Sequence, residues 1–327
     1  MAKKVKDTDY LFLSARIRAL ERRALNRQRT ERLLAASDEE WAQVLSEMGY
    51  PVPEGDESGF YAALERRQAE TFADLARYMP DPAILDVFRV KYDYHNLKAL
   101  IKSRGADCRS LLTDAGRIAA SAMADRYERT GKWDHLPPAM AKAAAESQRV
   151  LAETGDPQRS DFVLDRAYYE ELLALASASG SDYLLSYART LIDAANLRSA
   201  VRTRRMHRSG AFLRQVLFPG GSVSVDRILA SAGGVAALYR PTPLREAAEL
   251  GDAAAEGGDL TAFEKACDNA VERKVSEWHA VPFGAEVAVG YLASQESELA
   301  ALRIIYSGRM AGLDADAIRE RLRDRNV

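Results

Sequence analysis

The chain has 327 residues, which is enough for two or three domains that each bury a hydrophobic core. Its 46 basic and 48 acidic residues leave a net charge of −2, so there is no overall field for nucleic acid or for an acidic membrane. The two cysteines, Cys108 and Cys267, exclude a disulfide framework, and neither a signal peptide nor an apolar run of about 18 residues is present, so we expect a soluble, cytoplasmic chain.

Helical patterns follow one another along the whole sequence. In chain order, helices are expected over residues 9–34, from a capping box that begins at Ser37, over 58–78, 82–104, 117–130, 137–153, 161–177, 182–208, 224–232, 242–250, 258–277 and 285–309, and after Asp314. Strict alternation of apolar and polar residues never lasts more than a few positions, and there is no βαβ rhythm. The sequence therefore predicts an all-α protein.

The helix over 82–104 carries the most informative pattern. Asp81 can cap its N-terminus with Pro82 at the first helical position, and Gly105 can end it in the left-handed conformation. At 100° per residue, Asp93 and Asn96 share a stripe with apolar residues that include Leu97, whereas Lys98 and Lys102 lie off that stripe. An acid and an amide on such a stripe need hydrogen-bond partners, so we expect a buried polar network.

This pattern of acid, asparagine, leucine and base recurs about every hundred residues. Its three copies are Asp93, Asn96, Leu97 and Lys98; Asp193, Asn196, Leu197 and Arg198; and Glu298, Ala301, Leu302 and Arg303, the last with Glu296 before it. The segments that follow the first two copies also correspond, since residues 111–118 align with 216–223. Three related units are expected, with approximate bounds 1–105, 106–208 and 209–327.

Other candidate sites are weaker. Gly131 and Lys132 lack the remaining residues of a phosphate-binding loop, and the four histidines never recur at a ligand spacing, so neither nucleotide nor metal binding is expected. The densest basic run follows the second copy and contains Arg202, Arg204, Arg205 and Arg208. Without interleaved aromatic residues it favours a protein contact or a solvated face over nucleic acid.

An acid on an apolar stripe can also serve in general acid–base catalysis. A catalytic acid is usually needed once, however, whereas Asp93 and Asp193 recur at matched positions. Recurrence favours a role in helix packing.

These residues also carry a resemblance to a known family. Residues 92–98 and 192–198 resemble signatures of the C subunit of V-type and archaeal-type ATPases, whose counterpart in the eukaryotic V-ATPase is the d subunit. Further similar positions run from Tyr10 to Leu34 and from Gly284 to Leu322, so the resemblance covers nearly the whole chain. Ala301 departs from it, because the family generally has asparagine there.

The resemblance implies a funnel-shaped protein of three similar helical domains with pseudo-threefold symmetry. It also implies a subunit without catalytic residues, cofactor or small-molecule ligand. Such subunits lie on the cytoplasmic face of the membrane, seat the central-stalk shaft on the proteolipid ring and transmit torque. The repeats alone leave open a free-standing helical scaffold or adaptor, although their spacing is longer than the periods of ordinary solenoids. A helical enzyme that uses the acid of the first copy is the third hypothesis.

Overall fold

The computed structural model describes residues 5–51, 57–231 and 234–324, and all regular structure within these ranges is helical. This confirms the all-α prediction. The helices, with η for a 3₁₀ helix, are η1 Asp7–Tyr10, α1 Leu11–Leu20, η2 Glu21–Arg23, α2 Arg27–Ala35, α3 Asp38–Met48, α4 Glu57–Ala76, α5 Pro82–Ser103, η3 Arg109–Leu111, α6 Ala120–Thr130, α7 Pro138–Thr154, α8 Pro157–Ala178, α9 Asp182–Arg205, α10 Gly210–Gln215, α11 Val225–Ala230, α12 Ala236–Tyr239, α13 Arg245–Ala255, α14 Leu260–Ser276, η4 Glu277–Ala280, α15 Ala285–Met310 and α16 Ala315–Arg319.

The three copies of the repeated pattern lie on the three long helices α5, α9 and α15, which we call the signature helices. The caps of α5 are as predicted: Asp81 accepts from the Ala83 N–H, and Pro82 opens the helix. At its other end both Arg104 and Gly105 adopt positive φ, so the left-handed turn begins one residue earlier than expected. Ser181 caps α9 in the same way as Asp81 caps α5, through the N–H of Leu184.

The single helix expected over 9–34 is wrong. The chain leaves the helical conformation after η2, where Ala24 is extended, and Asn26 caps a new helix by accepting from the Arg29 N–H. The break frees the backbone N–H of Leu25, which donates to the Glu298 carboxylate on α15. A tertiary hydrogen bond therefore replaces a helical one at this position.

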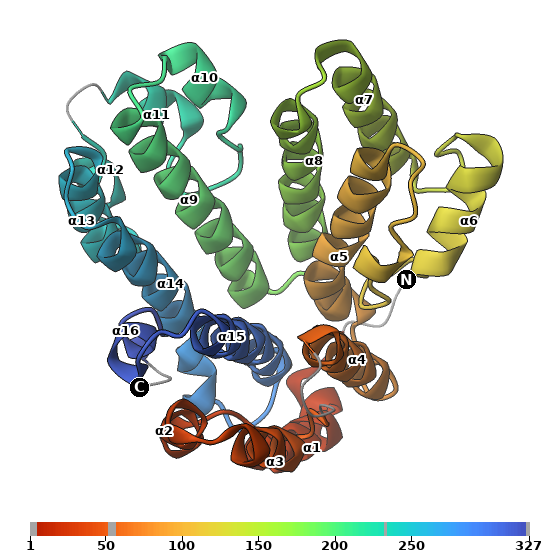
Figure 1. Ribbon diagram of the computed structural model, residues 1–327, viewed down its shortest axis with the longest axis vertical. Coiled ribbons are helices and arrows are strands. Elements are labelled where there is room, and N and C mark those ends of the chain that lie inside the picture. The colour runs from red at the N-terminus through yellow and green to blue at the C-terminus, as the bar shows by residue number, and fades with distance from the viewer. Residues whose placement is uncertain (1–4, 52–56, 232–233, 325–327) are drawn as a thin grey trace.

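The helices fall into three groups around the signature helices (Figure 1). One arm contains α5 to α8, the other arm contains α9 to α14, and the lower part of the view contains α1 to α4 with α15 and α16. The third group therefore combines the two ends of the chain. Of the helices that the structure describes, none combines the length and the apolar character needed to cross a membrane.

Buried apolar side chains form three clusters. The largest joins α5, α7 and α8 with α1 and the first half of α15. The second lies between the outer half of α9 and the helices α13 and α14. The third packs α2, α3 and the start of α4 against the outer half of α15 and α16. This third core ties segments together that are more than two hundred residues apart, and contacts of such long range are not visible in helical periodicity.

The helix before each signature helix also packs on the preceding signature helix. Thus α8 lies between α5 and α9, and α14 lies between α9 and α15. The cycle is completed by α4, which precedes α5 and packs on α15 through Phe60 and Tyr306, whose stacked rings are 4.0 Å apart. This cyclic packing is compatible with a pseudo-threefold arrangement, and the division of the chain at residues 105 and 208 stays a prediction.

Candidate functional site

The acid and the asparagine of the first copy hold the loop that follows α5. Asn96 is fully buried, and its side-chain amide donates to the carbonyl of Thr113 and accepts from the N–H of the same residue, both at 2.9 Å. Asp93, also fully buried, accepts from the N–H groups of Arg117 and Ile118 at 2.8 and 3.1 Å and from the Arg117 guanidinium at 2.6 Å. We call this arrangement the first clasp. It satisfies three backbone N–H groups and one backbone carbonyl of a segment that has no regular structure.

The second clasp repeats the first almost bond for bond. Asn196 donates to the carbonyl of Phe218 and accepts from its N–H, both at 2.8 Å. Asp193 accepts from the N–H groups of Ser222 and Val223 at 2.9 and 3.1 Å. The sequence correspondence between 111–118 and 216–223 therefore reflects identical hydrogen-bonding roles. Both segments are held on the buried face of a signature helix.

A glycine in each clasp is required by close approach. A Cβ atom on Gly116 would overlap Oδ1 of Asp93, and one on Gly221 would overlap Oδ1 of Asp193. Neither glycine has a positive φ, so the need is steric and not conformational.

The third clasp differs from the first two in its partners, which lie in the N-terminal segment. Glu298 accepts from the Leu25 N–H at 2.5 Å and from the Tyr50 hydroxyl at 2.6 Å. Ala301, at the asparagine position, has no side-chain hydrogen bond to offer. The N-terminal segment thus takes the place that a following loop takes in the first two clasps, and it is held by fewer bonds.

Burial sets the electrostatics of the three acids. It raises the pKa of the Asp93, Asp193 and Glu298 carboxyls above their ordinary values, against the opposing effect of the hydrogen bonds that they accept. The phenol of Tyr50 is affected in the same direction, since burial and the neighbouring Glu298 carboxylate raise its pKa.

The basic residue of each copy faces an acid on the next helix of the cycle. Lys98 pairs with Asp165 on α8 at 2.5 Å. Arg198 pairs with Glu264 and Asp268 on α14, each at 2.7 Å.

In the third copy, Arg303 lies near Glu65 on α4. Burial raises the pKa of Glu65, and the charges of His95 and Arg303 oppose this rise. Glu65 precedes Asp93 by 28 residues, the same separation as between Asp165 and Asp193. The acids on α4 and α8 therefore occupy corresponding places in sequence as well as in the cycle.

The three signature helices border a pocket of about 300 Å³. Lys91 of α5 pairs there with Glu296 of α15 at 2.5 Å. Burial lowers the pKa of Lys91, but the Glu296 carboxylate more than offsets this effect and the pKa is raised. Arg198 and Arg303 also line the pocket, so every signature helix contributes a cation to its wall.

The basic run at the end of α9 makes mostly internal contacts. Arg202 pairs with Glu264, Arg204 pairs with Glu256 at 2.7 Å, and Arg205 donates to the carbonyls of Ala254 and Gly258. The guanidinium of Arg208 lies 5.8 Å from the centre of the Phe212 ring.

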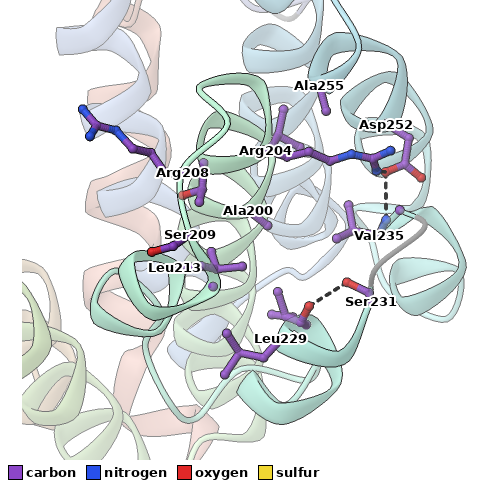
Figure 2. A pocket seen from close by; sticks show the side chains of 15 residues that line it. Ala200, Arg204, Arg208, Ser209, Leu213, Leu229, Ser231, Val235, Asp252 and Ala255 are labelled. Atoms are coloured by element: carbon purple, nitrogen blue, oxygen red, sulfur yellow. Dashed lines mark hydrogen bonds and ion pairs between the residues drawn. The ribbon is translucent and has the colours of Figure 1, made fainter.

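Arg204 and Arg208 also line a pocket of about 280 Å³, and in Figure 2 Arg208 extends away from the Arg204 side chain, which approaches Asp252.

The clasps are built for packing rather than for chemistry. Asp93 is 0% exposed, and its two oxygens accept three hydrogen bonds from Arg117 and Ile118, so a substrate cannot reach it to give up a proton. Across residues 5–51, 57–231 and 234–324, no three His, Cys, Asp or Glu side chains gather closely enough to hold a metal ion.

Comparison with known proteins agrees with the repeated signatures. Residues 13–321 match the family model described as ATP synthase (C/AC39) subunit. The chain belongs to this family. The C subunit of the V-type sodium ATPase of Enterococcus hirae is 24% identical, with 96% of this chain and 98% of the relative covered. The C subunits of the A-type ATP synthases of Desulfurococcus sp. and Methanocaldococcus jannaschii are 23% and 25% identical, each over 96% of this chain and over 91% and 86% of the relatives.

Within this C/AC39 subunit, sequence reasoning found the clasp acids and asparagines but missed their partners. Glu171 is one example: it pairs with Arg117 at 2.8 Å and accepts from the Tyr94 hydroxyl at 2.9 Å, which links the first clasp to α8. Glu65, which lies near Arg303 of the third copy, is another residue that sequence reasoning missed. Its separation of 28 residues from Asp93, equal to that between Asp165 and Asp193, was a signal that could have revealed it.

Proposed function

We propose that this C/AC39 subunit is a non-catalytic central-stalk component of a rotary ATPase that seats the shaft on the membrane proteolipid ring and transmits torque for ATP-coupled ion transport. The observation that carries the proposal is the family match over nearly the whole chain, together with relatives named as the C subunits of V-type and A-type enzymes. The protein then lies on the cytoplasmic face of the membrane and is bound to it through the ring. It needs no cofactor, nucleic acid or small-molecule ligand.

The packing supports a mechanical role. Two clasps fix otherwise irregular loops to signature helices, and ion pairs of the Lys98–Asp165 type join two long helices within each arm. Since buried hydrogen bonds are costly to leave unmade, such a body resists local opening. Stiffness is what a passive coupler requires.

We further propose that the three groups of helices are equivalent units related by pseudo-threefold symmetry, with bounds near residues 105 and 208. The cyclic packing of α4, α8 and α14 supports this arrangement. Partner contacts at Arg202, Arg204, Arg205 and Arg208 remain part of the proposal, with Arg208 as the strongest candidate because its guanidinium extends outward.

The enzyme hypothesis is disfavoured by the complete burial of Asp93, and the free-standing scaffold by the named relatives. The test is a paired measurement in reconstituted vesicles, with and without this protein. We expect ATP hydrolysis by the soluble head to persist without it and ATP-driven ion uptake to be lost. Full ion uptake in its absence, or ATP hydrolysis by the isolated chain, would contradict the proposal.

A further inference from the structure

The outer ends of the three signature helices differ in one respect. After α15 the chain forms the short helix α16, whose N-cap Asp314 accepts from the Ala317 N–H at 2.8 Å. After α9 it forms α10, whose N-cap Ser209 accepts from the Phe212 N–H at 3.2 Å. Asp314 follows Ser209 by 105 residues, the same separation as between Ala301 and Asn196. The helices α10 and α16 are therefore equivalent elements.

In the third group this place is filled. Ile318 on α16 is only 1% exposed, and it packs directly on Gly308 of α15, where a Cβ atom would approach the Ile318 side chain to 2.6 Å. The missing side chain at Gly308 lets the short helix lie against the signature helix.

In the second group the same place is open. Thr203 stands where the third group has Gly308, and Leu213 stands where it has Ile318. Leu213 is only partly buried, and a pocket of about 280 Å³ remains between α9, α10 and α11. Figure 2 shows Leu213, Leu229 and Val235 around this space, which we call the α9 pocket.

In the first group no helix of this kind forms. Ser103 stands at the Gly308 position, and the chain makes only the three-residue turn η3. A pocket of about 500 Å³ lies there, lined by Leu100, Ser103, Arg104 and, from α6, Tyr127. We call it the α5 pocket. The position next to the outer end of the signature helix is therefore filled in the third group, partly filled in the second group and empty in the first group.

We propose that the α9 and α5 pockets each receive an aliphatic side chain from a short helix of a partner protein in the complex, in the way that Ile318 of α16 fills the equivalent place at α15. The chain itself supplies the template for the occupant: a short helix with a branched apolar residue and an acidic N-cap. The inference rests on the proposed function, because it names the chemistry by which a partner in the complex binds.

Charge and exposure at the two pockets agree with this occupant. Arg208 lines the α9 pocket beside Arg204 and Asp252, which pair with each other, and Arg104 lines the α5 pocket beside Asp107 and the pair Arg109–Glu128. Among the ion pairs of the described residues, none involves Arg208 or Arg104. Each can therefore meet the acidic N-terminal turn of an incoming helix. Large apolar side chains that neighbour lining residues in the sequence are exposed: Met206, between Arg204 and Arg208, at 54%, and Leu111, two residues after Arg109, at 60%. Apolar surface at a rim with unpaired cations is typical of a docking site.

The test uses site-resolved thiol labelling of the full chain, alone and in the purified ATPase complex. Leu229→Cys reports on the α9 pocket, Ala106→Cys reports on the α5 pocket, and Lys142→Cys, which is exposed on α7 and lines neither pocket, is the control. If partner helices occupy the pockets, labelling of the two reporters slows by about tenfold or more on assembly, while the control changes little. Unchanged labelling of both reporters in an assembled complex would overturn the docking proposal and leave the proposed function intact. Failure of the wild-type chain to enter the complex would instead overturn the proposed function.

A second variant tests the need for the space. Ala200→Leu extends a side chain from α9 into the α9 pocket, so it should weaken incorporation into the complex by about tenfold without lowering the melting temperature of the isolated chain. Normal incorporation of a well-folded Ala200→Leu chain would count against an occupant there.

Discussion

Removing the asparagine of a clasp should be among the most damaging single substitutions in this protein. Asn96 is 0% exposed, and both hydrogen bonds of its amide go to one buried residue, Thr113. In Asn96→Ala the N–H and the carbonyl of Thr113 both lose their partner. An unsatisfied buried polar group costs about 1–3 kcal/mol, so the expected loss is about 2–4 kcal/mol. Asn196→Ala should give a loss of the same size, since Phe218 is held in the same way.

Urea unfolding followed by circular dichroism measures this loss, with Lys102→Ala as the control. Lys102 is exposed on the same helix and pairs with Asp161 at 3.2 Å, a surface contact whose loss should cost under about 0.5 kcal/mol. Hydrogen exchange adds a local readout, because the Thr113 amide should exchange faster in Asn96→Ala while amides of the second clasp keep their protection. If Asn96→Ala and Lys102→Ala unfold at the same urea concentration, the buried network does not hold the loop as argued.

Two further outcomes follow from the clasps. Gly116→Ala and Gly221→Ala should each lower the free energy of unfolding by about 1–3 kcal/mol, because the new methyl group overlaps a clasp carboxylate. The control Gly210→Ala has open space around it in α10 and should be neutral or stabilising. Equal effects of all three substitutions in thermal or urea unfolding would contradict the steric argument. Glu298 has a pKa raised by burial, so the folded state binds its proton more tightly, and the stability due to it is complete below about pH 4 and declines as the pH rises through the raised pKa. Glu298→Gln should remove this decline, and a wild-type stability that does not fall relative to Glu298→Gln between acidic and neutral pH would refute it.

The sequence predicts a buried polar network because the pattern is local and repeated. An acid and an asparagine three residues apart on an apolar stripe need polar partners, and the matched flanks 111–118 and 216–223 show that the following segment repeats as well, although they do not identify the partners. Thr113 and Phe218 lie 17 and 22 residues after their asparagines, within reach of a short connection. Helix type and order follow from periodicity for the same reason, because each long helix spans enough turns to show its stripe.

What the sequence misses depends on distant contacts or on short elements. At the break between α1 and α2, Leu25 donates to Glu298, which is 273 residues away, so this partner cannot be read from local sequence, whereas the N-cap Asn26 was a local signal that was missed. The short helices α10 and α12 have six and four residues, too few to show a helical period, and neither was expected.

The third clasp shows why the two ends of the chain belong together in this fold. On α15 the buried Glu298 carboxylate is covered by the N-terminal segment. Leu25 and Tyr50 supply this cover, which also brings α2, α3 and α4 onto α15 and closes the cycle of helices. Besides the Glu298 clasp, Arg309 donates to the Leu33 carbonyl and Arg319 pairs with Glu31 at 2.8 Å, so several polar contacts join the N-terminal segment to α15 and α16. For a protein proposed to carry torque, these contacts and the shared apolar core make the third group resist separation as one packed unit.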